Sequence, residues 1–183
     1  GKSYAYLYPA MEMGLRILVS TSNKALQQQL VKKDIPTVLS SYPGKKFCLV
    51  QGKSNYACLH KAAKVQLHGQ LKTWLEETKT GNTEDIDFSI NYDDLDRITA
   101  DDGCSGYRCN LYSKCFYYQA KAEREEADIL ICNHALLAIH LDNPEAGILP
   151  GEFDLIIVDE AHKLADYIRS VRNQITQPVT TDD

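Results

Sequence analysis

The stretch FDLIIVDEAH, residues 153–162, constrains the fold of this chain more than any other. Its apolar run Leu155–Val158 is short and unalternating, as expected for a parallel strand buried on both faces. The acids that follow, Asp159 and Glu160, would then lie at the carboxyl edge of a sheet, where α/β folds bind ligands. Such a pair can hold Mg²⁺ and polarise the water that attacks a γ-phosphate. The same acids also suit the start of a capped helix, and the stretch alone leaves the two interpretations nearly balanced.

The first three residues, Gly1, Lys2 and Ser3, match the end of the phosphate-binding pattern G-x-x-x-x-G-K-S/T. In that loop the lysine reaches the β- and γ-phosphates and the hydroxyl binds Mg²⁺. A helix should follow, and residues 4–13 suit one. Three residues are a weak match alone, but the acidic pair about 155 residues later makes an ATP and Mg²⁺ site the better interpretation. Because the first half of the pattern is absent, we expect the chain to be cut inside its ATP site.

Two more short apolar runs, residues 17–20 and 129–132, predict buried strands, and residues 23–33 predict a helix between them. Alternating helices and strands indicate an α/β fold, here a P-loop NTPase (RecA-like) parallel sheet with helices. Between these parts the amino-acid composition changes, first to a basic, turn-rich stretch and then to an acidic one. We interpret this middle part as a small, mainly helical subdomain that interrupts the sheet. The predicted segments are a first sheet part at 1–46, the insert at 47–118, a second sheet part at 119–169, and a last segment at 170–183.

Six cysteines need an explanation. The stretch CSGYRCNLYSKC has C-x4-C-x5-C spacing, wider than the close pairs that zinc sites use. Four thiolates are the usual ligands of a 4Fe–4S cluster, which suits the wider gaps better. Zinc stays open, and disulfides are disfavoured because an ATP site implies a reducing compartment. The four candidate ligands are Cys58, Cys104, Cys109 and Cys115, whereas Cys48 and Cys132 lie in apolar runs and are expected to act as small hydrophobic residues.

Charge is distributed unevenly along the chain. Residues 1–83 carry 12 Lys or Arg and 4 Asp or Glu, whereas residues 84–183 carry 8 and 21. A basic half can meet phosphates, although two ordinary solvated surfaces explain the imbalance equally well. No apolar run approaches the twenty or so residues of a membrane span, and no secretory signal pattern is present.

Taken in order, these stretches resemble the XPD/DinG family of superfamily 2 DNA helicases, and most closely its bacterial DinG branch. The matching segments are GKSYAYLYPA, ILVSTSNKALQQQL, GKSNYACL, CSGYRCNLYSKCFY, ADILICNHALL and LIIVDEAH, which cover nearly all of the chain except residues 79–102. The resemblance implies a 5′→3′ ATP-dependent DNA helicase of DNA repair or replication. Its iron–sulfur subdomain helps to form the pore for single-stranded DNA. The resemblance also implies that the two sheet parts, 1–46 and 119–169, belong to motor lobe 1 and that the last segment, 170–183, is either the start of an arch domain or a tail.

The resemblance also implies roles for individual residues. Gly1, Lys2 and Ser3 would bind ATP and Mg²⁺, Asp159 would bind the metal, and Glu160 would be catalytic together with Asp159 and Lys2. His162 would couple the ATP site to the other motor lobe. The four cysteines would hold the 4Fe–4S cluster. The segment that would touch the DNA backbone is Thr21, Ser22 and Asn23, which could equally be a plain helix cap.

The expected partners are ATP, single-stranded DNA and forked or tailed duplex DNA, with no membrane and a monomeric state. The expected location is the bacterial cytoplasm or nucleoid. Because the second motor lobe and most of the arch are missing, we expect this piece alone to be inactive. Two alternatives stay open: a non-motor, metal-stabilised nucleic-acid-binding module on a degenerate ATPase scaffold, and an ATPase with a zinc site.

Overall fold

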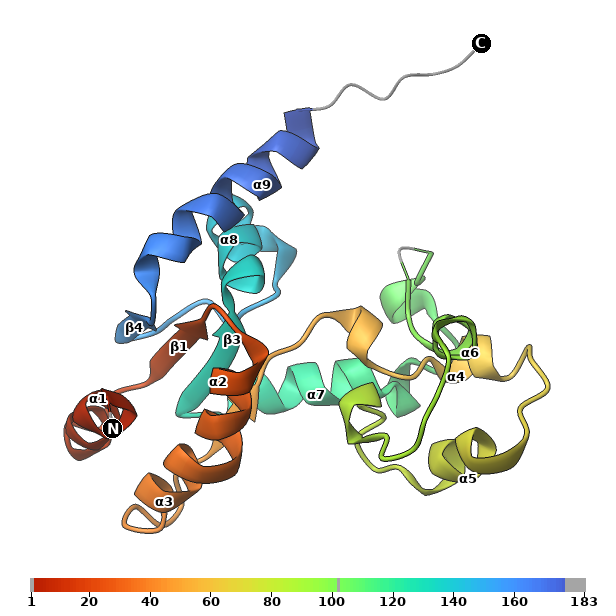
Figure 1. Cartoon of the computed structure of the whole chain (residues 1–183), viewed down its shortest axis with the longest axis horizontal. Helices are drawn as coiled ribbons and strands as arrows, with labels where there is room; N and C mark the ends of the chain where they lie inside the picture. The colour runs from red at the N-terminus through yellow and green to blue at the C-terminus, as the bar shows by residue number, and fades with distance from the viewer. Residues whose placement is uncertain (1, 102, 177–183) are drawn as a thin grey trace. The chain divides into compact units, whose positions relative to one another are not determined.

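The computed structural model describes residues 2–101 and 103–176 of the chain (Figure 1). The chain folds into two compact units. The first unit consists of Gly1–Gln51 and Arg124–Asp183, and the second unit is Gly52–Glu123. Gly1 lies outside the described residues. No helix in the described ranges is long and apolar enough to cross a membrane.

The first unit is built around a parallel sheet. Its strands are β1 (Ile17–Thr21), β2 (Phe47–Leu49), β3 (Ile129–Asn133) and β4 (Leu155–Val158), in the spatial order β2-β3-β1-β4. Its helices are α1 (Lys2–Glu12), α2 (Lys24–Gln29), α3 (Ile35–Leu39), α8 (His134–Asp142) and α9 (Leu164–Thr176), and a π-helical turn, Leu30–Asp34, joins α2 to α3. The predicted α/β sheet is confirmed, and its parallel pairing is consistent with a RecA-like lobe.

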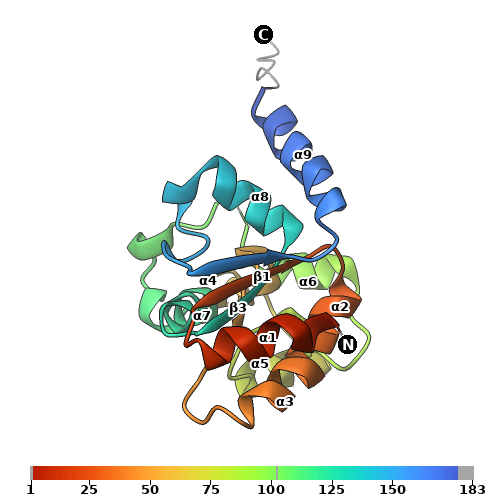
Figure 2. The same ribbon diagram turned by 90° about the vertical axis from the view of Figure 1, so that its left-hand side faces the viewer.

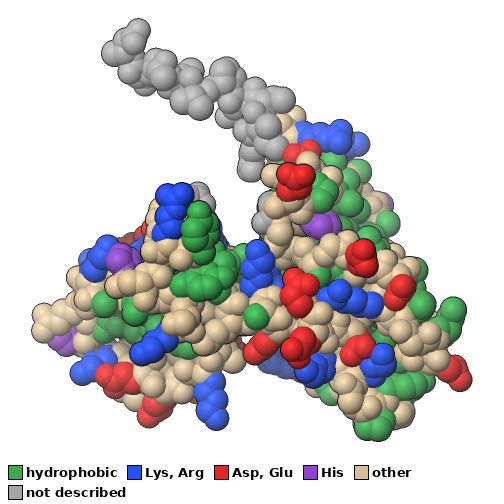
Figure 3. Space-filling view, turned by 180° about the vertical axis from the view of Figure 1, so that it is seen from behind, with side chains coloured by type: hydrophobic (Ala, Val, Ile, Leu, Met, Phe, Trp, Pro, Cys, Tyr) green, Lys and Arg blue, Asp and Glu red, His purple; other side chains and the backbone are tan. Residues whose placement is uncertain are grey.

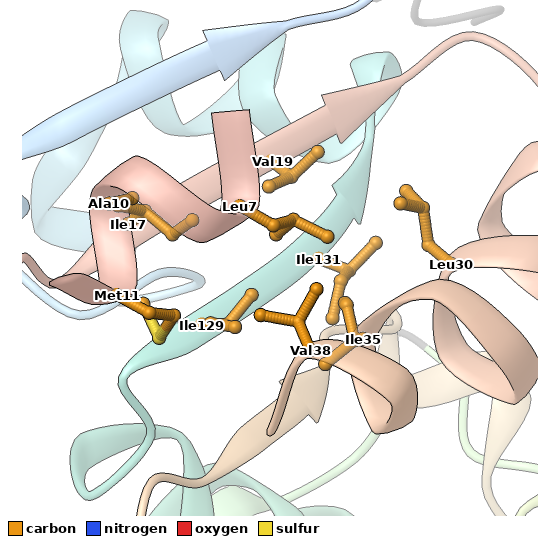
Figure 4. Close-up of a cluster of buried hydrophobic side chains, with 10 residues drawn as sticks. All are labelled: Leu7, Ala10, Met11, Ile17, Val19, Leu30, Ile35, Val38, Ile129 and Ile131. Atoms are coloured by element: carbon orange, nitrogen blue, oxygen red, sulfur yellow. The ribbon is translucent and has the colours of Figure 1, made fainter. Parts of the chain in front are cut away.

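Apolar side chains leave both faces of the sheet and meet a separate helix layer on each side. Figure 2 shows α1 and α3 on one side of the strands and α8 on the other. On the first face Ile17 and Val19 of β1 pack with residues from α1, the α2–α3 segment and β3, as the close-up in Figure 4 shows. On the second face Leu18 and Leu130 pack against Leu136 and Leu137 of α8. Every residue of β1 is therefore buried, as its unalternating sequence predicted.

One expectation about burial was wrong. Leu155 and Ile156, predicted to be buried on both faces, are 39% and 44% exposed. The reason is position, because β4 lies at the end of the strand order and pairs only with β1 among the described strands. The sequence pattern identified the strand and its bounds but not its place at the edge of this sheet.

Arg16 holds the start of the sheet together. Its guanidinium donates to the backbone carbonyls of Ala127 at 3.1 Å, Arg124 at 2.9 Å and Glu125 at 3.1 Å. Its own backbone N–H donates to the Asp154 carboxylate at 2.7 Å, just before β4. The starts of β1, β3 and β4 are therefore tied to one residue, Arg16, at the edge opposite their carboxyl ends.

The second unit is made of short helices and turns. Its elements are α4 (Leu59–Ala62), α5 (Gly69–Glu77), α6 (Tyr92–Ile98) and the larger part of α7 (Phe116–Glu125), with single 3₁₀ turns at Lys53–Asn55, Thr83–Asp85, Gly106–Arg108 and Tyr112–Lys114. Two isolated antiparallel bridges, Tyr56↔Asn82 and Ala57↔Thr99, connect its distant parts. Buried residues at its centre are Tyr56, Ala57 and Ile98.

The bounds of the second unit differ from the expected insert at 47–118 by five residues at each end. At the first end, Phe47–Leu49 forms β2 and pairs with β3, because these residues supply the apolar strand that covers the open side of β3. At the second end, α7 is one continuous helix that runs into Arg124, whose side chain is buried in the first unit.

The uneven charge along the sequence does not become two separate surfaces. Lys45 pairs with Asp128 at 2.7 Å, Lys46 with Glu126 at 2.6 Å, and Lys61 with Asp101 at 3.0 Å. Each pair joins the basic part of the sequence to the acidic part. Figure 3 accordingly shows basic and acidic side chains interspersed on the face that it presents.

Candidate nucleotide site and cysteine cavity

The acidic pair lies where β4 ends. The Asp159 backbone N–H donates to the Ser20 carbonyl at 2.9 Å, which extends the β1–β4 pairing by one residue. Glu160 then adopts a left-handed backbone with φ 51° and ψ 48°, and its N–H donates to the Asp159 carboxylate at 2.9 Å. Glu160 is the one non-glycine residue of the described chain with positive φ. Residues held in such strained backbone conformations are concentrated at functional sites.

The Glu160 carboxylate is held by two donors. The Ser22 hydroxyl donates to its Oε2 atom, and the Lys163 ammonium donates to the same atom at 2.7 Å. Lys163 Nζ also lies 3.4 Å from Ser22 Oγ, so the three groups form a closed cluster. These contacts lower the pKa of Glu160 to about 2, the Lys163 contact most and the Ser22 hydroxyl next. The carboxylate is therefore ionised at neutral pH and is a weak base in this arrangement.

The predicted DNA-contact residues are the last residue of β1 and the two residues after it, and they do three different things. Thr21 is fully buried, and its hydroxyl donates to the Asn23 carbonyl at 3.3 Å. The Asn23 side chain accepts from the Leu26 N–H at 2.8 Å, which makes it the cap of α2. Of the three, Ser22 alone places its side chain on the acidic pair.

The predicted phosphate-binding residues open α1. Lys2 is exposed and Ser3 is 5% exposed. Figure 2 shows α1 beginning at the side of the sheet where β1 and β4 end. Tyr6 lies one turn further on. Burial raises the pKa of Tyr6, and the negative charge of Asp159 adds to that rise, so the two side chains lie near each other. The start of α1 and the acidic pair therefore share one edge of the sheet.

Two histidines also border this edge. His134, directly after β3, is fully buried, and its Nδ1 atom lies 2.7 Å from Ser20 Oγ. Burial lowers the pKa of His134, while the nearby backbone of Asp159 and Glu160 partly opposes that change. His162 is exposed, and its charge contributes weakly to the low pKa of Glu160. The sequence analysis assigned a role to His162 but none to His134.

Lys163 is the site residue that the sequence analysis missed. It lies three residues after Glu160, and helical spacing of opposite charges is a known signal for an ion pair. The contact between Glu160 and Ser22 had no comparable signal, because 138 residues separate them and only the pairing of β1 with β4 brings them together.

The four candidate cysteine ligands converge in the second unit. Cys58, Cys104, Cys109 and Cys115 line a single cavity of about 30 Å³. Four tyrosines surround the same space: Tyr56, Tyr112, Tyr117 and Tyr118. Burial raises the pKa of Cys115, and the nearness of Cys104 and Cys58 adds to that rise. All six cysteines of the chain lie in the described ranges as free thiols, so the disulfide alternative has no support here.

Tight turns present these thiols to the cavity. Cys109 directly follows the 3₁₀ turn Gly106–Arg108, and Cys115 directly follows Tyr112–Lys114. The Cys104 N–H closes a turn onto the Asp101 carbonyl at 3.2 Å, and the Cys58 N–H donates to the Ile98 carbonyl at 2.6 Å. The backbone of each cysteine is therefore held by a hydrogen bond from its own N–H.

The four thiols are spread around the cavity. In the described ranges, no three or more His, Cys, Asp or Glu side chains form a group that could hold a metal ion. Thiolates are nonetheless the donors that both a zinc ion and an iron–sulfur cluster use, and all four candidate cysteines line the same space.

Paired acids at a strand end, beside the start of a helix that opens with Lys-Ser, are consistent with the RecA-like class of α/β proteins. Comparison with known families agrees with this class. The chain belongs to the DEAD_2 family, whose model matches residues 19–177.

Curated relatives point the same way. The chain is 33% identical over 187 residues to the ATP-dependent DNA helicase YoaA of Escherichia coli (strain K12), which covers 91% of this chain and 29% of that protein. It is 33% identical over 207 residues to the ATP-dependent helicase DinG of Mycobacterium tuberculosis (strain ATCC 25618 / H37Rv), which covers 93% of this chain and 31% of that protein. The predicted resemblance to this helicase family is confirmed. The chain spans about 30% of the length of these relatives.

Proposed function

We propose that this chain is part of the first motor lobe of an ATP-dependent DNA helicase that moves 5′→3′ along single-stranded DNA. The observation that carries the proposal is the shared sheet edge, where the acidic pair, the segment after β1 and the start of α1 come together. The names of the relatives, which are ATP-dependent helicases, support the same function.

Each group at this edge has chemistry that suits ATP hydrolysis. Lys2 and Ser3, with Gly1, would hold the phosphates and Mg²⁺ together with Asp159. Glu160 would orient the attacking water, because it is the second acid and lies beside the first. His162 would carry the state of this site toward the second motor lobe. Catalysis of this type rests on positioning and electrostatics, which the rigid carboxyl edge of a sheet can supply.

The segment Thr21–Asn23 would face the DNA backbone, with Ser22 as its available hydroxyl. Hydroxyl groups are common donors to phosphate oxygens in protein–DNA complexes. Such contacts fix the register of a strand without reading its sequence, as a translocating motor requires.

We also propose that Cys58, Cys104, Cys109 and Cys115 hold a 4Fe–4S cluster in the second unit. The cavity that all four line supports this assignment. Such a cluster would supply four metal–thiolate bonds that tie together chain segments lacking a large apolar core. The second unit would then be a rigid body that separates the two DNA strands.

Strand separation by the full-length gene product tests the function. A duplex with a 5′ single-stranded tail should be unwound in the presence of ATP and Mg²⁺, and one with a 3′ tail should be unwound much less. Unwinding from the 3′ tail alone would overturn the proposed direction. ATP-independent binding without unwinding of either substrate would favour the non-motor alternative.

A further inference from the structure

The contact between Ser22 and Glu160 joins two groups to which the proposed function gives different tasks. Ser22 belongs to the segment that would meet DNA, and Glu160 is the residue that would orient water. Their side chains are in direct hydrogen-bond contact, with Lys163 completing the cluster. The Ser22 hydroxyl of the proposed DNA-contact segment therefore already donates to the Glu160 carboxylate of the proposed ATP site.

The two donors differ in how many partners each can serve. A serine hydroxyl has one proton, so Ser22 can donate to Glu160 or to a phosphate but not to both. The Lys163 ammonium has three protons and can keep its contact with Glu160 while it contacts another anion. Ser22 must therefore give up its bond to Glu160 when it donates to a phosphate, whereas Lys163 can keep its bond to Glu160.

The backbone makes the position of Glu160 depend on these contacts. Glu160 is in the left-handed region at φ 51°, a conformation that is unfavourable for a non-glycine residue. All of the hydrogen bonds described for its carboxylate fall on the one oxygen, Oε2. The side chains of Glu160 and Lys163 are 38% and 46% exposed, so an incoming phosphate can reach the cluster.

We infer that Ser22 and Lys163 are positioning residues that hold Glu160 away from its water until a DNA phosphate takes over the Ser22 hydroxyl. DNA occupancy would then remove the Ser22 donor from Oε2, leave the Lys163 contact in place, and switch on ATP hydrolysis. This inference rests on the proposed function, and it adds a direct route from the DNA segment to the ATP site within one lobe.

Rates of ATP hydrolysis by the full-length gene product, with and without saturating oligothymidine, test the inference. Ser22→Ala should raise the DNA-free rate about 3- to 10-fold, the factor that corresponds to one net hydrogen bond. The ratio of the rate with DNA to the DNA-free rate should therefore fall. The matched control is Ser40→Ala, whose hydroxyl donates to the Thr37 carbonyl away from the site. A Ser22→Ala protein with an unchanged or lower DNA-free rate and an unchanged ratio overturns the inference.

The unmodified full-length protein separates failure of the inference from failure of the proposed function. If it hydrolyses no ATP with or without oligothymidine, the proposed function is refuted. If oligothymidine stimulates its hydrolysis and Ser22→Ala leaves both rates unchanged, the inference alone is overturned.

Discussion

Ser20 and His134 form a buried contact, 2.7 Å between Oγ and Nδ1, that ties β1 to the residue after β3. Both side chains are fully buried, directly beneath the edge where Asp159 and Glu160 lie. Removing the hydroxyl leaves a buried ring nitrogen without its partner. We expect Ser20→Ala to lower the free energy of unfolding by about 1–3 kcal/mol, measured by urea denaturation of this chain.

The control for that prediction is again Ser40→Ala, whose exposed hydroxyl should contribute less than about 0.5 kcal/mol. Equal effects of the two substitutions would show that the Ser20–His134 contact contributes nothing to stability.

Buried histidines predict how stability depends on pH. Burial lowers the pKa of both His134 and His140 below 6.5 in the folded chain. The unfolded chain therefore takes up protons near pH 6.5 before the folded chain does, and this favours unfolding. Stability should be fully present above pH 6.5 and should fall as the pH drops from 7.5 to 5.5.

Urea midpoints at these two pH values measure the effect. His134→Gln, which cannot titrate, should make the dependence on pH shallower. A midpoint that rises as the pH falls would contradict the burial of these rings. The carboxyl groups of Asp128 and Glu160, whose pKa values are lowered, titrate below this pH range, so the histidines account for the change within it.

Gly81 limits the packing of the second unit. It has φ +60°, and a Cβ at this position would lie 2.2 Å from the Phe116 ring. Gly69 has nearly the same φ, +58°, with nothing within 4 Å of the corresponding position. Both alanine variants pay the left-handed cost of about 1–2 kcal/mol. Gly81→Ala should cost about 1–3 kcal/mol more, because it also overpacks. Equal unfolding free energies for the two variants would contradict the close Gly81–Phe116 contact.

Iron analysis tests the cysteine cavity. Anaerobically purified protein should contain about four iron atoms and as many acid-labile sulfides per chain. Cys109→Ser should lose most of both, because one of four ligands is missing. Cys48→Ser is the matched control, since Cys48 lies on β2 rather than at the cavity. Zinc in place of iron, or equal loss in both variants, would refute the assignment.

The strands were predictable because their sequences carry the signal. Leu155–Val158 is β4 with the predicted bounds, and residues 17–20 and 129–132 each extend by one residue into β1 and β3. Three-residue β2 was not predicted, because so short a run between turn residues has no periodicity to read.

The long-range contacts were not predictable from the sequence. The acidic segment 84–102 contained few residues for a core, yet Ile98 is fully buried. Its burial comes from the bridge between Ala57 and Thr99 and the hydrogen bond from Cys58 to Ile98. For the same reason the nucleotide site was found only as separate motifs, and its connection through Ser22 and Lys163 required the fold.

The most direct test of the proposed motor is ATP hydrolysis by the full-length gene product carrying Glu160→Gln, with single-stranded DNA present. The amide cannot orient and polarise water as the carboxylate does, so the hydrolysis rate should fall about 10²- to 10⁴-fold while ATP binding is retained. Glu152→Gln, an exposed change just before β4, should leave the rate unaltered. A Glu160→Gln protein that hydrolyses ATP at the unmodified rate would contradict the account.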